Sequence, residues 1–262
     1  MTALAGALSS QPSTAQSGPG VVFAQPGDSV FRALYPTIDS TTGLTPVAEP
    51  AVAAGRRTPR RPPEECDGGF KIAEPVTKEW NLAGTGYVLA SFFVTTDNTP
   101  GTHSPCYKPE PWVCVLEPRA PAVVPVDCTT VEPVVFPEFS SLDTAPFRLN
   151  ETEKAFGVRL RSGISTRSDT EAREALILFR LHDRRLTQVL AVTIGLSTDT
   201  YGDGECSREL TLGAEKTTTG GFFDWRTRTG KKTGALPCRL ETGTYRWDGA
   251  RYVRSVDVRP RR

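Results

Sequence analysis

The sequence predicts a mainly β protein, an antiparallel β-sandwich or barrel-like meander with a short N-terminal helix and a Pro-rich, disulfide-held middle segment. Three observations predict it. Short runs that alternate apolar and polar residues, separated by turn residues, fill the C-terminal half. Prolines crowd the middle of the chain, and six cysteines are dispersed along it without a C-x-x-C pair.

Residues 1–65 are predicted to be a leader, a short helix and a Pro/Arg-rich linker, largely flexible. The first twenty residues have almost no apolar side chains to bury. In "GDSVFRALYPTI", Asp28 or Ser29 can cap a helix with an apolar stripe through Phe31 and Leu34, and Pro36 ends it. The arginines of residues 56–61 lie in a proline-dense stretch, which is typical of an extended linker; a basic docking motif or a processing site is the alternative.

Residues 66–262 are predicted to form a single β domain, with a sub-boundary near residue 147. The run "GYVLASFFVTTDN" at 86–98 is strongly apolar, β-branched and aromatic, which predicts a buried strand. Residues 99–146 contain many prolines, and proline donates no hydrogen bond to a strand ladder. We therefore expect short edge strands and loops there.

From residue 147 onward the pattern predicts a meander of short strands. In "FGVRLRSGI", Val158 and Leu160 face one way, and Arg159 and Arg161 the other. The run "EALILFRLHDRRLTQVLAVTIGL" predicts two strands joined by a tight turn at His182, Asp183, Arg184 and Arg185. Residues 169–176 fit either a helical turn or an extension of the strand.

The stretch "TYRWDGARYV" predicts a closing hairpin. A two-residue turn at Asp248 and Gly249 would set Arg246 opposite Arg251, a repulsive pair that a neighbouring Asp224 or Glu241, or a bound anion, would offset. The same register gathers the aromatic residues on one face. They either pack into the core, the favoured interpretation, or form an exposed platform for a sugar or a protein; the candidates are Trp225, Tyr245, Trp247 and Tyr252.

The even number of cysteines predicts two or three disulfides and hence an oxidising compartment. Six cysteines allow 15 pairings, so spacing alone does not fix the connectivity. We expect Cys206 to pair with Cys238, because both lie in the C-terminal β region. The other candidates are Cys66, Cys106, Cys114 and Cys128.

The composition of the chain indicates which classes of partner the protein binds and in which compartment it is found. The 31 basic and 30 acidic residues leave a net charge of +1, which argues against a dedicated nucleic-acid binder. No apolar run is long enough to span a membrane. The start, "MTALAGALSS", has the small residues of a signal-peptide cleavage region but lacks a basic n-region and a full apolar h-region, so a disordered leader is the alternative. Ala, Arg and Pro usage indicates a GC-rich bacterium. We expect a periplasmic or secreted bacterial protein.

The sequence carries no recognisable catalytic motif, such as a nucleophile elbow, a P-loop or a zincin helix. Of the two histidines, His103 lies three residues before Cys106, where a disulfide would remove a reactive thiolate. We expect no cofactor. The loop at residues 197–206 is rich in oxygen ligands, and Asp199, Asp203 and Glu205 could bind calcium, but an acidic turn between strands is the favoured interpretation.

We therefore expect an exported, non-enzymatic binding protein with a protein partner. Its most specific form is a periplasmic inhibitor or immunity-type protein that blocks a toxin or hydrolase through surface loops, with the 182–185 turn and the 199–205 loop as candidates. The alternative is a carbohydrate or cell-wall binding module, with or without calcium, whose aromatic side chains would be exposed. A hydrolase that uses two facing carboxylates is the third hypothesis.

Overall fold

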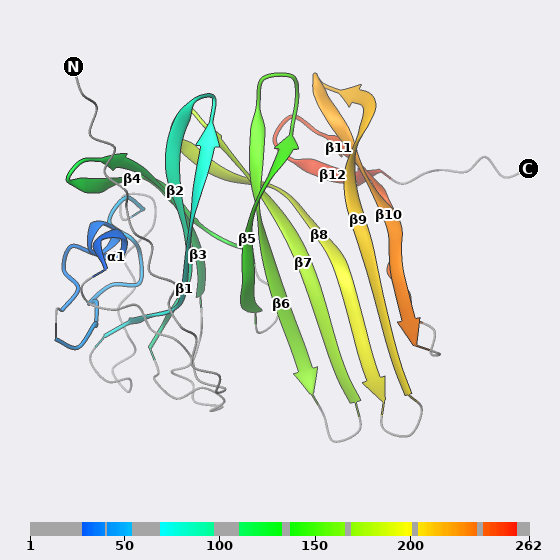
Figure 1. Ribbon diagram of the computed structural model, residues 1–262, viewed down its shortest axis with the longest axis horizontal. Coiled ribbons are helices and arrows are strands. Elements are labelled where there is room, and N and C mark those ends of the chain that lie inside the picture. The colour runs from blue at the N-terminus through cyan, green and yellow to red at the C-terminus, as the bar shows by residue number, and fades with distance from the viewer. Residues whose placement is uncertain are drawn as a thin grey trace, which may run out of the picture.

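The computed structural model describes residues 28–39, 41–53, 69–96, 110–132, 137–165, 169–200, 204–234 and 238–255. These residues form one short helix and two antiparallel sheets, which confirms the predicted fold class (Figure 1). Among them, no helix has the length and hydrophobicity needed to cross a membrane. The division of the chain at residues 66 and 147 stays a prediction.

The first sheet has four strands in sequence order: β1 (Lys71–Leu82), β2 (Thr85–Thr95), β3 (Glu110–Arg119) and β4 (Ala122–Thr130). It is preceded by helix α1 (Ser29–Leu34), where the carboxylate of Asp28 accepts a hydrogen bond from the Val30 N–H at 2.9 Å. This is the capping interaction that the sequence predicts, because a side-chain oxygen there satisfies a free N–H of the first turn.

The second sheet has eight strands, and each strand pairs with its neighbours in sequence, as a meander requires. The two-residue turn predicted between His182 and Arg185 is present, and Asp183 and Arg184 at its tip both have positive φ. Residues 169–176 are strand rather than helix. The strands are β5 (Pro137–Arg148), β6 (Lys154–Ser165), β7 (Asp169–His182), β8 (Arg185–Thr200), β9 (Gly204–Thr219), β10 (Phe222–Gly234), β11 (Thr244–Trp247) and β12 (Tyr252–Ser255).

The proline-rich middle differs from the prediction of short edge strands. Strand β3 has ten residues and lies inside its sheet, between β2 and β4. The prolines avoid the centre of the ladder: Pro111 and Pro118 lie next to the ends of β3, and Pro125 of β4 lies at a register shift. These are positions where a missing N–H costs little, so proline did not exclude a central strand.

The four-stranded sheet is buried on both faces because alternate side chains point in opposite directions. On one face, Phe92 of β2 packs edge-to-face against Phe31 of α1, with ring centroids 5.3 Å apart. On the other face, Val113 and Val115 of β3 share a core with Phe156 of β6. Figure 1 shows α1 on the side of this sheet away from the long meander.

The eight-stranded sheet curls until its C-terminal strands lie over its own earlier strands. The Phe223 N–H donates to the Leu149 carbonyl at 2.8 Å, and the rings of Phe147 and Trp225 lie 6.0 Å apart. These contacts join the β9–β10 turn to the end of β5. A separate hydrophobic core fills the curl, including Leu176 of β7. Strand β7 therefore contacts one core on each face.

The two sheets are also joined by a buried carboxylate. Asp127 of β4 is fully buried, and its two oxygens accept from the N–H groups of Cys128, at 2.8 Å, and Leu186, at 2.6 Å. Leu186 belongs to β8, so this side chain bonds across the boundary between the sheets.

Replacing Asp127 with alanine will lower the free energy of unfolding by about 1–3 kcal/mol for each buried donor left without an acceptor. Urea denaturation measures the change. As a control, Glu79→Ala removes an exposed carboxylate from β1, and it will change stability by less than about 0.5 kcal/mol. Equal effects of the two variants would contradict this role for Asp127.

Two disulfides lie within the described residues, Cys206–Cys238 and Cys114–Cys128, and no cysteine there is free. The first is the pair that the sequence predicts. The second joins neighbouring strands β3 and β4 within the middle segment. Cys66 and Cys106 lie outside the described residues.

Removing the Cys206–Cys238 disulfide by a double alanine substitution will cost about 4 kcal/mol, because this bond closes the longer loop, with a sequence separation of 32. The Cys114–Cys128 bond, with a separation of 14, will cost about 3 kcal/mol. Urea denaturation compares the two. Peptide mapping without reduction must recover both linked peptides, and a mixed pairing would contradict the connectivity.

Candidate functional site

The aromatic residues of the closing hairpin are mostly buried. Trp225, Trp247 and Tyr252 are between 3% and 7% exposed, and they pack in the core of the curled sheet. Phe222 stacks on Trp247 with centroids 4.3 Å apart, so a ring face that a sugar would need is already covered. Tyr245 is half-buried. The exposed platform that the glycan hypothesis requires is therefore absent from this described hairpin.

The register of the hairpin differs from the prediction. Trp247 pairs with Tyr252, so the loop has four residues, and Arg246 lies opposite Val253 rather than Arg251. The cause is the side chain of Asp248, whose carboxylate accepts from two N–H groups, those of Ala250 and Arg251, each at 2.9 Å. These bonds hold the pKa of Asp248 below its ordinary value and favour the wider turn.

Of the two carboxylates expected to offset the Arg246–Arg251 pair, the buried Asp224 lies 3.7 Å from Arg246 Nε. Glu241 lies instead beside Arg254, 2.6 Å from its Nη1. Hydrogen bonding to Glu241 raises the pKa of Arg254.

The four residues of the turn at 182–185 are exposed, and two of their side chains lie near carboxylates of neighbouring segments. His182 Nδ1 lies 3.5 Å from Glu153, and Arg184 Nη1 lies 3.6 Å from Glu117 of β3. The second contact joins the turn to the four-stranded sheet.

The proposed calcium ligands are only partly described. Asp199 and Glu205 lie opposite each other where β8 and β9 pair, and Asp203 is outside the described residues. Among the residues that the structure describes, no group of three or more His, Cys, Asp or Glu side chains converges on a point. The calcium site stays a prediction.

One pair of carboxylates is brought together in the described residues by an arginine. Arg159 of β6 bonds to Asp143 of β5 and Glu174 of β7, each at 2.9 Å. Burial alone would lower the pKa of Arg159, but these hydrogen bonds raise it above its ordinary value. Both carboxylates are thus paired with one permanent cation, and the cluster joins three neighbouring strands.

The feature that sequence reasoning missed is an open strand edge on β8. Strand β8 pairs with β7 along its whole length, but it pairs with β9 only from Gly195 to Thr200. No strand in the described part of the chain pairs with the outer edge of residues 186–194. Strand β12 has a free outer edge as well, since β11 is its one described neighbour.

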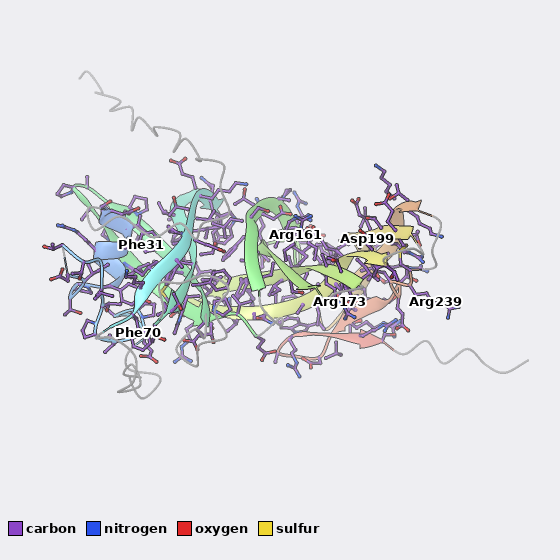
Figure 2. The ribbon with its side chains drawn as sticks, turned by 90° about the horizontal axis from the view of Figure 1, so that it is seen from below. Phe31, Phe70, Arg161, Arg173, Asp199 and Arg239 are labelled. Atoms are coloured by element: carbon purple, nitrogen blue, oxygen red, sulfur yellow. A yellow bond between two sulfur atoms is a disulfide. The ribbon has the colours of Figure 1, made fainter. Side chains whose placement is uncertain are left out.

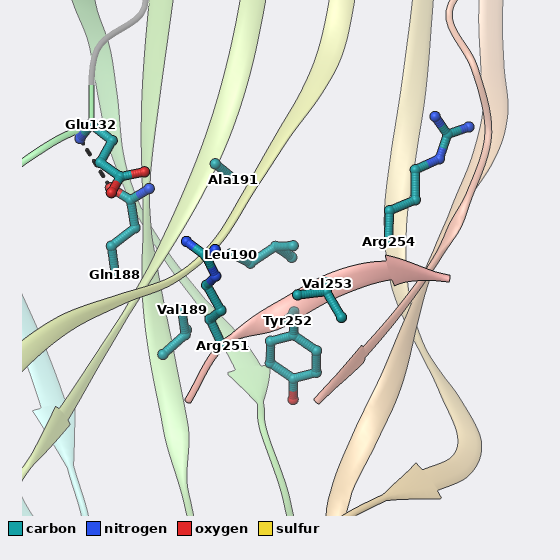
Figure 3. A pocket seen from close by; sticks show the side chains of 9 residues that line it. All are labelled: Glu132, Gln188, Val189, Leu190, Ala191, Arg251, Tyr252, Val253 and Arg254. Atoms are coloured by element: carbon teal, nitrogen blue, oxygen red, sulfur yellow. Dashed lines mark hydrogen bonds between the residues drawn. The ribbon is translucent and has the colours of Figure 1, made fainter. Parts of the chain in front are cut away.

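These two free edges face each other across a cleft of about 270 Å³, which we call the edge cleft (Figure 3). It is lined by residues 188–191 of β8, by Arg251 of the hairpin loop and by residues 252–254 of β12, with Glu132 at one end. Alternate side chains of a strand point to opposite faces. A cleft lined by consecutive residues of each strand therefore lies along the strand edges rather than over one face.

A second hollow of about 320 Å³ adjoins the first, and we call it the arginine pocket. Thr193 and Leu196 continue the wall along β8, and Arg254 belongs to both hollows. Figure 2 shows Arg173 and Arg239 towards the end of the molecule away from Phe31 and Phe70. The remaining lining residues are Arg173, Arg239, Leu240, Glu241 and Tyr245.

One sequence signal marks the open edge. Gly195 interrupts an apolar strand run, and a glycine inside a strand often marks a bulge or a close approach. A Cβ at this position would lie 3.0 Å from the Glu174 Cβ, and the β7–β8 register shifts here. The pairing of β8 with β9 also begins at this residue.

No protein-family model matches the chain, and neither does a curated protein or a solved structure.

The Tyr252 hydroxyl, which lies 3.5 Å from the Leu149 carbonyl, gives a test of burial in the core of the curl. Burial raises its pKa to about 12, from an ordinary value near 10. The fold thus favours the neutral phenol. Its stabilising contribution is complete below about pH 10 and is lost as the pH rises to about 12, because the unfolded chain releases the proton first.

We expect the unfolding free energy to fall over this window, measured by urea denaturation at a series of pH values. In Tyr252→Phe the unfolding free energy will fall less over this pH window, because the phenol of Tyr252 no longer titrates. An identical pH dependence in both proteins would contradict the burial of this hydroxyl.

Proposed function

We propose that the chain is an exported protein-binding protein that docks a segment of its partner along the open edge of β8. Its most specific form is a periplasmic inhibitor or immunity-type protein of a bacterium, which blocks a toxin or hydrolase. The observation that carries the proposal is the edge cleft, where two unpaired strand edges face each other.

A free strand edge presents N–H and C=O groups that can pair with another chain. An extended segment of a partner can add to such an edge, where main-chain hydrogen bonds supply affinity and side-chain pockets supply specificity. Residues 188–194 of β8 would span roughly 23 Å, at about 3.3 Å per residue. In this mode of binding the partner contacts a strand of the protein, rather than the 182–185 turn and the 199–205 loop that the sequence suggested.

The surface chemistry of the edge cleft also supports a protein partner. Val253 is 39% exposed, the most exposed large hydrophobic side chain among the described residues, and it lies in this cleft beside Arg251 and Arg254. An apolar residue flanked by arginines is typical of protein interfaces, where Arg is enriched.

Export is supported by the two disulfides, since such bonds persist in oxidising compartments.

The test is capture of the partner from bacterial periplasm and secreted fractions, followed by calorimetry with the purified partner. Val253→Glu will weaken binding at least about tenfold, because it removes an apolar contact and places a charge in the cleft. The new carboxylate lies opposite Arg246, so the fold is retained.

Thr211→Glu is the matched control, because it also places a glutamate opposite an arginine, Arg228, at an exposed strand position outside the cleft. It will leave the affinity unchanged. The proposal fails if both variants bind the partner as the parent does. It also fails if no protein is captured while a glycan or peptidoglycan binds measurably.

A further inference from the structure

We infer that the arginine pocket binds a carboxylate side chain at the end of the docked segment, so that the partner presents an extended, acidic strand. This inference rests on the proposed function and names the chemistry of the partner. It follows from the charge of the pocket, from its place along β8 and from the geometry of the groups that line it.

Positive charge is concentrated here although the chain as a whole is almost neutral, with a net charge of +1. Three arginines line the pocket against one glutamate, Glu241. Glu241 is already engaged with Arg254, and Arg173 pairs with Glu171 at 2.5 Å. Arg239 makes no ion pair within the described part of the chain. The pocket therefore has a cation to spare, which complements an anionic partner.

The position of the pocket determines which part of the partner it meets. A strand docked along residues 188–194 cannot continue further, because β9 occupies the edge of β8 from Gly195 onward. The arginine pocket lies at that point, with Thr193 and Leu196 in its wall. The terminal residue of the docked strand is thus the one whose side chain enters the pocket.

The lining groups suit a carboxylate in particular. A guanidinium presents planar, paired donors that match the two oxygens of a carboxylate. Tyr245 adds a hydroxyl at the pocket wall. Burial raises its pKa, and the charge of Arg254 lowers it in part, so the hydroxyl stays protonated and can donate.

The probes are three nonapeptides, ETVTVTVTE, QTVTVTVTQ and KTVTVTVTK, each with fluorescein attached to its N-terminal amine and with an amidated C-terminus. A charged residue at both ends covers either strand direction. Fluorescence anisotropy will show at least about tenfold tighter binding of the glutamate peptide than of the glutamine peptide. The lysine peptide will bind most weakly, and raising the salt concentration will reduce the difference. The peptide ETVTPTVTE will lose binding, because proline removes a main-chain donor.

Arg239→Gln will abolish the preference for the glutamate peptide, and Arg239→Glu will reverse it in favour of lysine. The control is Arg148→Glu, an exposed arginine of β5 outside both hollows, and it will keep the preference. Circular dichroism and the melting temperature verify that each variant is folded.

Equal binding of the glutamate and glutamine peptides overturns the inference, and so does an unchanged preference in both Arg239 variants. These outcomes are separate from the test of the proposed function. A captured partner whose affinity depends on Val253 but not on Arg239 would overturn the acidic strand alone. Loss of the Val253 dependence would overturn both.

Discussion

The architecture depends on strand β7 being buried on both faces. The apolar run at its centre supplies Ile177 and Phe179 to the core shared with the four-stranded sheet, and Leu176 and Leu178 to the core of the curl. Such a strand is stable only if another layer excludes water from each face. One layer comes from the N-terminal half of the chain. The other comes from the sheet itself, which must bend until its last strands return over β7.

The open edge of β8 is a consequence of that bend. Strands β8 and β9 pair at one end only, and from Leu210 onward β9 follows β10 away from β8. The hairpin of β11 and β12 returns to close the far side, with Tyr252 buried in the core and its hydroxyl 3.5 Å from the Leu149 carbonyl. The hairpin contacts β8 without pairing with it. The core is thereby covered, and part of one strand edge remains available.

The sequence predicted what is local and periodic. Alternation and turn residues identified the meander, and the shared region of Cys206 and Cys238 identified their disulfide. The predictions that were wrong depended on individual side chains, whose local hydrogen bonds a pattern of apolar and polar residues does not reveal. The hairpin register followed the side chain of Asp248, and prolines were tolerated at strand ends and at a bulge. The two hollows could not be foreseen, because they arise where β8 parts from β9 and β12 approaches from sixty residues further along the chain.

An open strand edge is usually a liability, because two copies of a chain can pair through it. The arginines around the β8 edge oppose that outcome here. Arg251 of the hairpin loop and Arg254 of β12 lie across the cleft from β8, so a second copy that approached through its own β12 would bring like charges together. An acidic strand of a partner is instead attracted by these arginines. The charges that protect the edge from self-association therefore favour an acidic partner. Resistance to self-association and selectivity for the partner have the same electrostatic origin.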